Sequence, residues 1–458
     1  MHTEKRKKPP IDYLLYPIQE FIHTEISGSL FLIGATVLAL VWANSAWGES
    51  YTALWHTYVK FSIADDFFKL DKSLLHWIND GLMVVFFFVV GLEIKREVLV
   101  GELTSLRKTA LPIMAALGGM VVPALIFVAF NATGEAASGW GIPMATDIAF
   151  ALGILALVGS RAPLSLKVFL TALAIIDDIG AVLIIAFFYT EQVLWISLLI
   201  ALGIWLLMWI ANWAGVRHPL IFGILGVVLW IAFLKSGIHA TVAGVLAAMT
   251  IPARTRINAE DFLKRARHYL EKFKLAQQPR TSVLTNRRQR AAVQKLETIA
   301  KAAQSPMQRL EHGLHPWVAF FIVPVFALAN AGVAFSINRE LFTSPVVWGI
   351  VLGLVLGKQV GVTLFAWLAV KFGLADLPTG LTWRHVYGAG WLAGIGFTMS
   401  LFVGGLAFGD GELLSQAKIG ILAASVIAGG IGWLILRTTP PAIPEAEDPV
   451  LAPKSTHA

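Results

Sequence analysis

The segment Leu173-Ala-Ile-Ile-Asp-Asp-Ile-Gly-Ala-Val-Leu-Ile-Ile-Ala186 places two adjacent aspartates, Asp177 and Asp178, in an otherwise uncharged apolar run. Such a run can lie in membrane hydrocarbon, where an ionised carboxylate is costly to keep. Neighbouring side chains on a helix diverge by about 100°, so one aspartate can face a cavity while the other faces another helix. The pair is therefore a candidate site for binding and releasing positive charge. The alternative is a structural pair neutralised by a lysine or by backbone amides.

The composition around this segment indicates a membrane protein. Of 458 residues, 57% are hydrophobic and 14% are charged, and the mean hydropathy is +0.70. A soluble globular domain has about 25% charged residues. The chain has no cysteine, which excludes disulfides, thiolate metal sites and a cysteine nucleophile. Its long continuous apolar runs predict an all-α polytopic fold and differ from the short alternating segments of an outer-membrane barrel.

About twelve apolar runs are long enough to cross roughly 30 Å of hydrocarbon. The third to fifth and the tenth to twelfth runs form two three-span groups that odd and even numbering makes inverted in orientation. Inverted-topology repeats are typical of transporters. The predicted spans are residues 24–45, 73–97, 109–131, 139–158, 166–190, 192–213, 219–235, 237–252, 313–335, 346–371, 386–408 and 414–437.

The distribution of lysine and arginine predicts the orientation. With the N-terminus inside, 29 of the 36 basic residues fall in segments assigned to the cytoplasm and 6 fall outside, which follows the positive-inside rule. Both termini are thus expected to be cytoplasmic. The predicted organisation is a basic N-terminus 1–22, spans within 23–252, a basic cytoplasmic loop 253–312, spans within 313–437 and a disordered tail 438–458.

The long loop holds 14 basic and 5 acidic residues, so its net charge of +9 exceeds the +7 of the whole chain. One interpretation is attraction to anionic lipid headgroups. The other, which we favour, is a solvated charged linker with some helix around 291–303. Nucleic-acid binding is not expected, because no aromatic residues alternate with the basic ones in the pattern that such binding uses.

Two spans are interrupted where polar residues enter the membrane. Gly139-Trp-Gly-Ile-Pro-Met-Ala-Thr-Asp147 contains helix-breaking glycine and proline before Thr146 and Asp147. Unwound backbone at membrane depth is tolerated only where it lines protein or water, and such breaks often hold ions. The alternative is a proline-kinked helix with Asp147 as a shallow cap. Tyr387-Gly-Ala-Gly-Trp-Leu-Ala-Gly-Ile-Gly-Phe-Thr-Met-Ser400 is the matching glycine-rich segment in the second three-span group.

Lys358 lies near the middle of the tenth span. A lysine buried there needs a counter-ion, and the candidate carboxylates are Asp147, Asp177 and Asp178. We expect Asp177 or Asp178 to be the partner.

Charged residues also gather at the cytoplasmic ends of the second and ninth spans. Histidine titrates near neutrality, so this cluster could sense internal pH; the alternative is interfacial charge that fixes helix depth. His312 and His315 lack the intervening glutamate of a zinc-protease motif. The candidate pH-sensing residues are Glu93, Arg96, Glu97, Glu311, His312 and His315.

From His23 to Leu436 the chain resembles bacterial NhaA-type Na⁺/H⁺ antiporters. The motifs that carry the resemblance are spread along the chain and are specific in combination. They are Phe86-Phe-Phe-Val-Val-Gly-Leu-Glu-Ile-Lys-Arg-Glu97, Pro143-Met-Ala-Thr-Asp-Ile-Ala-Phe150, Ala174-Ile-Ile-Asp-Asp-Ile-Gly180, Leu234-Lys-Ser-Gly-Ile-His-Ala-Thr241, Leu310-Glu-His-Gly-Leu-His-Pro-Trp317, Phe326-Ala-Leu-Ala-Asn-Ala-Gly332 and Gly357-Lys-Gln-Val-Gly361. The long loop before the ninth span is shorter in many relatives.

The resemblance implies a secondary transporter, not an enzyme, that exports Na⁺ or Li⁺ in exchange for external H⁺ by alternating access. It implies that Asp177 and Asp178 bind the cation or protons, with Asp178 the first choice for the cation and Asp177 alternating between Lys358 and a proton. Thr146 and Asp147 would belong to crossed, unwound helices, and the charged cytoplasmic cluster would regulate by pH. More protons would enter than Na⁺ leaves, which makes the cycle electrogenic. No cofactor is expected, and a homodimer is left open.

Two other functions remain alternatives. A channel or proton-coupled symporter for another solute would use the aspartates only as a proton relay, although few sugar- or amine-binding groups surround them. A membrane-embedded aspartyl protease needs two aspartates facing each other from different helices, and no Gly-x-Gly-Asp sequence is present around these residues.

Overall fold

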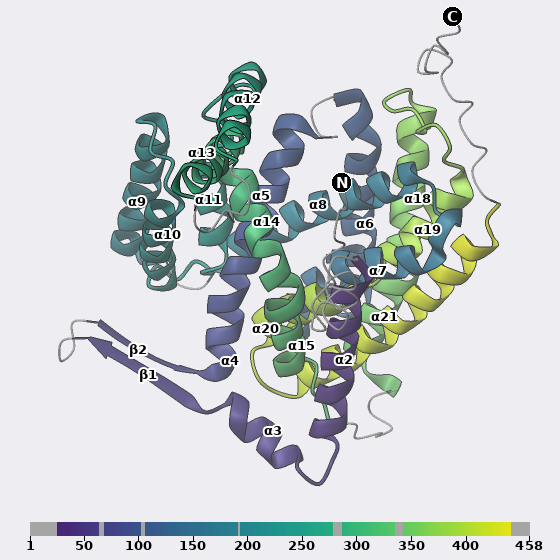
Figure 1. Ribbon diagram of the computed structural model, residues 1–458. Coiled ribbons are helices and arrows are strands. Elements are labelled where there is room, and N and C mark those ends of the chain that lie inside the picture. The colour runs from purple at the N-terminus through teal and green to yellow at the C-terminus, as the bar shows by residue number, and fades with distance from the viewer. Residues whose placement is uncertain are drawn as a thin grey trace, which may run out of the picture. The chain divides into compact units, whose positions relative to one another are not determined.

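The computed structural model describes residues 25–63, 68–101, 106–190, 193–277, 286–334 and 342–440. The predicted N-terminal segment 1–22 lies outside these residues, as does most of the predicted tail 438–458. The all-α fold class is confirmed, because helices make up nearly all of the described chain (Figure 1).

All twelve predicted spans coincide with helices. The first eight correspond to α2 Glu25–Ala43, α5 Met83–Val100, α6 Leu106–Phe130, η4 Glu135–Met144 with α7 Ile148–Val158, α8 Leu164–Phe188, α9 Trp195–Trp213, α10 Pro219–Leu234 and α11 Val242–Thr250. The last four are α14 Pro306–Trp317 with η6 Val318–Ile322 and α15 Val323–Asn330, α17 Pro345–Leu352 with η7 Gly353–Gly357 and α18 Lys358–Lys371, α19 Trp383–Ala393 with α20 Phe397–Phe408, and α21 Glu412–Thr438.

Length and composition separate these helices into two groups. Within the described residues, seven helical segments are long and apolar enough to cross a membrane. The number rises to nine if each of two bent helix pairs is counted as one span. The other three predicted spans are α5, α10 and α11. Helix α5 carries Glu93, Lys95, Arg96 and Glu97 near its end, whereas α10 and α11 have 16 and 9 residues.

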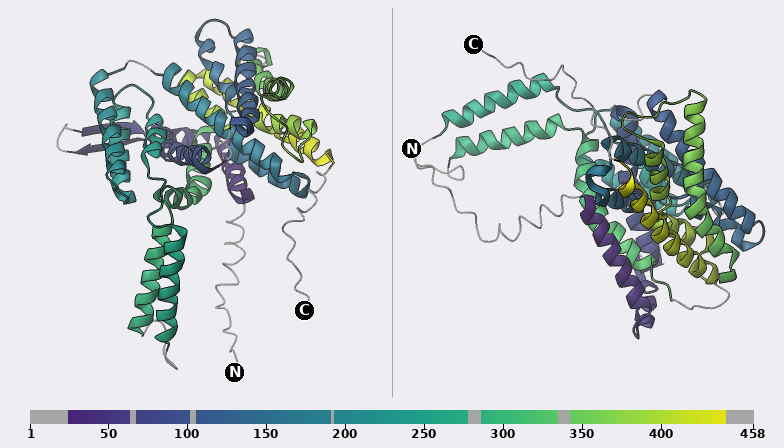
Figure 2. Two further views of the ribbon diagram at one scale, coloured as in Figure 1. Left: turned by 90° about the horizontal axis from the view of Figure 1, so that it is seen from above. Right: turned by 90° about the vertical axis from the view of Figure 1, so that its right-hand side faces the viewer.

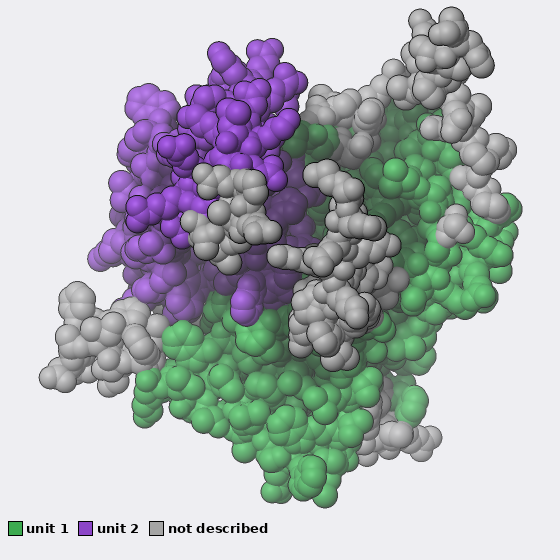
Figure 3. All heavy atoms as spheres, viewed as in Figure 1, with its two compact units in different colours: residues 1–83, 97–191, 319–458 green, residues 84–96, 192–318 purple. Residues whose placement is uncertain are grey.

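The chain divides into two compact units (Figure 3). Unit 1 comprises Met1–Met83, Glu97–Glu191 and Ala319–Ala458, and unit 2 comprises Val84–Arg96 and Gln192–Val318. Both predicted three-span groups lie in unit 1. The five segments into which the sequence analysis divides the chain remain a prediction.

In unit 1, helices α6 and α18 pack closely because glycines face each other across the contact. A Cβ atom at Gly119 would lie 2.9 Å from Val362 Cγ2 and 3.6 Å from Lys358 Nζ. Only a residue without a side chain lets the two backbones approach this closely, as is common between membrane helices. The π-helical turn η7 ends directly before Lys358, so this contact sets the position of that lysine.

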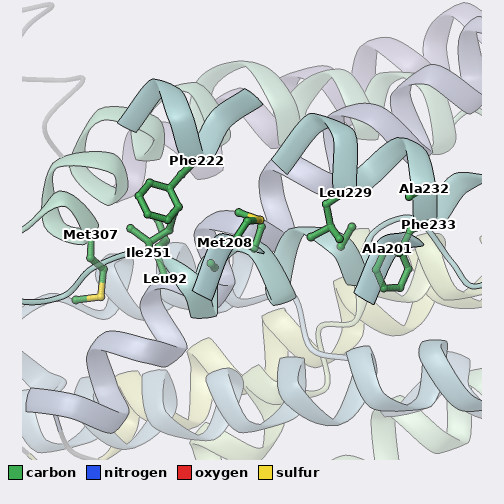
Figure 4. Close-up of a cluster of buried hydrophobic side chains, with 12 residues drawn as sticks. Leu92, Ala201, Met208, Phe222, Leu229, Ala232, Phe233, Ile251 and Met307 are labelled. Carbon is green, nitrogen blue, oxygen red and sulfur yellow. The ribbon is translucent and has the colours of Figure 1, made fainter. Parts of the chain in front are cut away.

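Unit 2 has its own apolar core between α5, α9, α10 and α11 (Figure 4). Met208, Phe222 and Leu229 belong to it, together with Leu92 of α5 (Figure 4). Polar side chains in this unit bond to neighbouring backbone: Trp205 Nε1 donates to the Leu246 carbonyl at 3.0 Å. The packing is thus apolar, with its few donors satisfied, as hydrocarbon requires.

The long loop of unit 2 contains two helices, α12 Ala259–Leu275 and α13 Arg287–Ala303, which lie side by side (Figure 2). Asn258 and Asn286 cap their N-termini through side-chain oxygens, a strong helix-start signal. Lys301 lies one turn after Glu297 and donates to it at 2.5 Å. That bond and the lysine charge hold the pKa of Glu297 below its ordinary value. The helix expected near 291–303 is therefore longer than predicted and has a partner.

A two-stranded antiparallel hairpin lies between the first two spans and was not predicted. Strand β1 is Tyr58–Ile63 and β2 is Phe68–Ser73, with Tyr58 opposite Ser73 and Lys60 opposite Asp71. The Lys60 Nζ to Asp71 Oδ2 distance is 3.5 Å, a cross-strand ion pair that favours this register.

Candidate ion-binding site

The adjacent aspartates lie midway along α8 and are both buried, with 2% and 3% of Asp177 and Asp178 exposed. The Oδ2 atom of Asp177 accepts hydrogen bonds from Lys358 Nζ and from Thr146 Oγ1, the latter at 2.6 Å. The other oxygen, Oδ1, is buried and has no hydrogen-bond partner among the described residues. A buried carboxylate oxygen without a donor is a position where a proton or a cation is strongly favoured.

Lys358 enters this site from α18 and is fully buried. Of the two expected counter-ions, the structure pairs it with Asp177. In unit 1 the described residues bury three carboxylates, Asp147, Asp177 and Asp178, with this one lysine. If all four groups are ionised, negative charge is in excess, so the site attracts cations.

Thr146 connects Asp177 to the second interrupted helix pair. Its Oγ1 lies 2.6 Å from Asp177 Oδ2 and 2.8 Å from the carbonyl oxygen of Ala393, the last residue of α19. A hydroxyl carries one hydrogen, so it can donate to only one of these two acceptors at a time. The direction in which Thr146 donates therefore depends on whether Asp177 carries a proton.

Asp147 lies where the two interrupted spans meet. It is the N-cap of α7, and its Oδ1 accepts from Phe150 N at 3.0 Å. Its Oδ2 accepts from the backbone N and the hydroxyl of Thr398, at 3.0 and 2.5 Å, in the first turn of α20. The backbone N of Asp147 donates to the Ile395 carbonyl at 2.7 Å. One carboxylate thus faces the N-termini of two helices, where negative charge is stabilised.

The cap that we considered for Asp147 is present, but it is deeply buried and not shallow, since only 2% of the residue is exposed. Both of its oxygens have protein donors, whereas Asp177 keeps one unpaired. Sequence reasoning identified Thr146 and Asp147 but not Thr398 or the Ala393 carbonyl. The signal for Thr398 is a hydroxyl residue two positions after the Gly394-Ile-Gly396 break.

The charged residues proposed for pH sensing are only partly brought together. In unit 2, Arg96 forms an ion pair with Glu311, whose side chain is 6% exposed. His312 and His315 are exposed on α14, and His312 Nδ1 lies 2.8 Å from the Gln308 carbonyl of its own helix. Glu93 is half-buried in unit 2, and Glu97 is half-buried in unit 1.

Lys95, which adjoins this group, has a structural role. Its Nζ donates to the carbonyls of Met249 and Ile251 at 2.6 and 2.5 Å. These carbonyls lie at the end of α11, where a positive charge is stabilising.

No group of three or more histidine, aspartate and glutamate side chains arranged to hold a metal ion occurs in the part of the chain that the structure describes. The unpaired Oδ1 of Asp177 is an oxygen ligand of the kind that a hard cation prefers.

Comparison with known proteins matches the chain, over residues 19–436, to the family described as Na⁺/H⁺ antiporter 1. A protein of Oleidesulfovibrio alaskensis named Na(+)/H(+) antiporter NhaA is 54% identical over 429 residues, which cover 93% of this chain and 95% of that protein. Proteins of the same name from Koribacter versatilis and Acidithiobacillus ferrooxidans are 50% and 51% identical, and the matches cover 99% and 92% of this chain and 97% of each relative.

Proposed function

The chain belongs to the Na⁺/H⁺ antiporter 1 family, and on this premise we propose that Asp177 and Asp178 are the site at which it exchanges Na⁺ for H⁺. A multi-pass sodium/proton antiporter of a bacterial inner membrane is what the family and the apolar helices support. We further propose that Li⁺ is also carried, that both termini face the cytoplasm and that the basic loop 253–312 lies there too.

The observation that carries the proposal is the asymmetry of Asp177. One oxygen is shared by Lys358 and Thr146, and the other is buried without a donor from any residue that the structure describes. When Na⁺ enters from the cytoplasm, it binds the oxygens of Asp178 and the unpaired oxygen of Asp177, and protons leave. After reorientation, external protons displace the cation, and Lys358 again pairs with Asp177.

The excess of buried carboxylates over the buried lysine supports an electrogenic cycle. Three buried carboxylates, those of Asp147, Asp177 and Asp178, offer more than one place for a proton, so more than one proton can enter for each Na⁺ released. Net positive charge then enters in each cycle, so the membrane potential drives transport.

Alternating access is assigned to the two interrupted spans. Their breaks contact each other through Asp147, Thr398 and the Ile395 carbonyl, and Thr146 links them to Asp177. A change in the charge of Asp177 therefore reaches both breaks through one hydroxyl. Broken helices that meet at the binding site are the movable elements of many secondary transporters.

Regulation by pH is assigned to the cytoplasmic group that includes Arg96, Glu311, His312 and His315. The Arg96–Glu311 pair joins α5 to α14, and His312 and His315 lie exposed on the same α14.

The test uses everted membrane vesicles that hold a preformed pH gradient, followed with a pH-sensitive dye. Adding Na⁺ or Li⁺ is expected to collapse the gradient, and Asp178→Asn is expected to abolish the collapse. Asp410→Asn, at an exposed carboxylate before α21, is the matched control and should transport normally. No cation-dependent proton movement in the wild type from mildly acidic to alkaline pH would refute the antiporter. Proton movement with an organic solute instead would favour the symporter.

Electrogenicity has its own test. Clamping the membrane potential at zero with valinomycin and K⁺ is expected to accelerate Na⁺-dependent proton movement, because charge no longer accumulates. An unchanged rate would indicate an electroneutral exchange.

A further inference from the structure

A second polar site lies beside Lys358, formed by Gln359 and Thr363 on α18. Gln359 is 2% exposed, and neither its amide nitrogen nor its amide oxygen has a hydrogen-bond partner among the described residues. The buried Oγ1 of Thr363, one turn further along the helix, has no partner there either. Side-chain polar groups inside a membrane protein are normally paired with protein or water, so three unpaired atoms on one face indicate a hydrated place.

The site adjoins the ion-binding aspartate across α19. A Cβ atom at Gly390 would lie 3.0 Å from Gln359 Cα, so Gly390 and Gln359 are in close contact. Ala393, three residues after Gly390, offers the carbonyl that contacts Thr146, which in turn contacts Asp177. One helical turn rises about 5.4 Å, so the Gln359–Thr363 site lies about one turn of α19 from the Asp177 cluster.

We propose that the Gln359 carboxamide and the Thr363 hydroxyl bind Na⁺ or Li⁺ with its remaining water on the way between Asp177 and the C-terminal end of α18. This inference rests on the proposed function, because it names a further binding site for the transported cation. Amide and hydroxyl oxygens are the kind of neutral ligand that holds a small hard cation without trapping it. The side chains replace part of the hydration shell that the ion loses before it reaches the carboxylates.

A purely structural role predicts different behaviour. A buried amide that only holds helices together would be dry and inaccessible to ions, and its replacement would lower stability without changing the apparent affinity for Na⁺. A site on the ion path is in contact with water, and bound Na⁺ protects it from chemical labelling. Its substitution alters the dependence of transport on the Na⁺ concentration.

Thiol labelling separates these two roles, because the full chain has no cysteine and each single-cysteine variant carries one thiol. We would prepare Gln359→Cys, Thr363→Cys and Val360→Cys, and treat everted vesicles with a small cationic methanethiosulfonate. Val360 is the matched control, since it lies on the same helix and 52% of it is exposed on the apolar exterior.

The cysteines at 359 and 363 are expected to react about tenfold or more faster than the one at 360, because thiolate forms only in contact with water. Na⁺ should slow their labelling, and choline at equal ionic strength should not. Labelling as slow as at 360, or labelling that Na⁺ does not slow, would overturn the inference. This readout does not depend on transport by the variant.

Transport by near-isosteric variants gives the second measurement. Gln359→Met and Thr363→Val should raise the Na⁺ concentration for half-maximal antiport about threefold to tenfold, the loss of one or two hydrogen bonds, with a smaller effect on the maximal rate. Gln359→Asn should restore part of the affinity. Thr36→Val removes a buried hydroxyl that donates to the Leu32 carbonyl of its own helix and should match the wild type.

The outcomes distinguish the two proposals. A wild type without antiport refutes the proposed function. A wild type with antiport, together with Gln359→Met and Thr363→Val variants of unchanged Na⁺ affinity, refutes only the Gln359–Thr363 site.

Discussion

Lys358 and Asp177 form an ion pair in which neither side chain has any exposed surface. Removing two charges from water is costly, and only their mutual attraction and further hydrogen bonds offset that cost. Thr146 supplies one such bond, and Asp177 Oδ1 has no donor in the part of the chain that the structure describes. The carboxylate is therefore paired but incompletely satisfied, as a group that must exchange its partner requires.

The first prediction concerns stability. Lys358→Met and Asp177→Asn each leave one buried charge unpaired and should each lower the free energy of unfolding by about 3–5 kcal/mol. The double variant removes both charges and should recover most of this loss. The measurement is unfolding in detergent followed by tryptophan fluorescence. Additive losses in the double variant would show that the two side chains are not energetically coupled.

The second prediction concerns the hydroxyl that links Asp177 to α19. Thr146→Val keeps the shape of the side chain but removes its contacts with Asp177 Oδ2 and the Ala393 carbonyl. A hydrogen bond to a charged group contributes about 1.5–3 kcal/mol, so antiport should fall by roughly tenfold to a hundredfold. Thr146→Ser retains the hydroxyl and should keep most of the activity, measured as Na⁺-dependent collapse of the pH gradient. Equal activity of both variants would remove the hydroxyl from the mechanism.

The third prediction concerns Gly119, which makes room for Lys358 between α6 and α18. In Gly119→Ala the new Cβ would lie 2.9 Å from Val362 Cγ2, so the helices must separate and the lysine must shift. Overpacking of this kind costs about 1–3 kcal/mol, and transport should slow with the loss of stability. Gly430→Ala is the matched control, because nothing lies within 4 Å of the added atom. Similar melting temperatures of the two variants would contradict the close packing.

Hydropathy, together with the glycines and proline that interrupt helices, predicts much of this architecture. Long apolar runs locate the spans, and the glycines and proline in 139–147 and 387–400 locate the breaks. Other features depend on three-dimensional position. Whether Lys358 meets Asp177 or Asp178 depends on the rotation of α8, since neighbouring side chains diverge by about 100°. The contact between Asp147 and Thr398 joins residues 251 positions apart.

Two further features have signals too weak for sequence alone. The hairpin Tyr58–Ser73 is short and half polar, so a search for long apolar runs passes over it. Gln359 follows Lys358 directly, and only the three-dimensional packing shows that its amide is buried and has no partner among the described residues.

The last prediction concerns pH regulation at the Arg96–Glu311 pair. Glu311→Gln keeps the size of the side chain but removes the charge that faces Arg96. If this pair transmits internal pH to α5 and α14, the pH dependence of antiport should shift while the maximal rate at the optimum changes little. His312→Ala should shift it less, because this histidine is exposed and its hydrogen bond is to Gln308 of its own helix. Initial rates across a pH series in everted vesicles measure both variants against the wild type. A profile that coincides with the wild type in Glu311→Gln would assign the pair to fixing the helices, because a charge that carries a pH signal cannot be removed without moving the response.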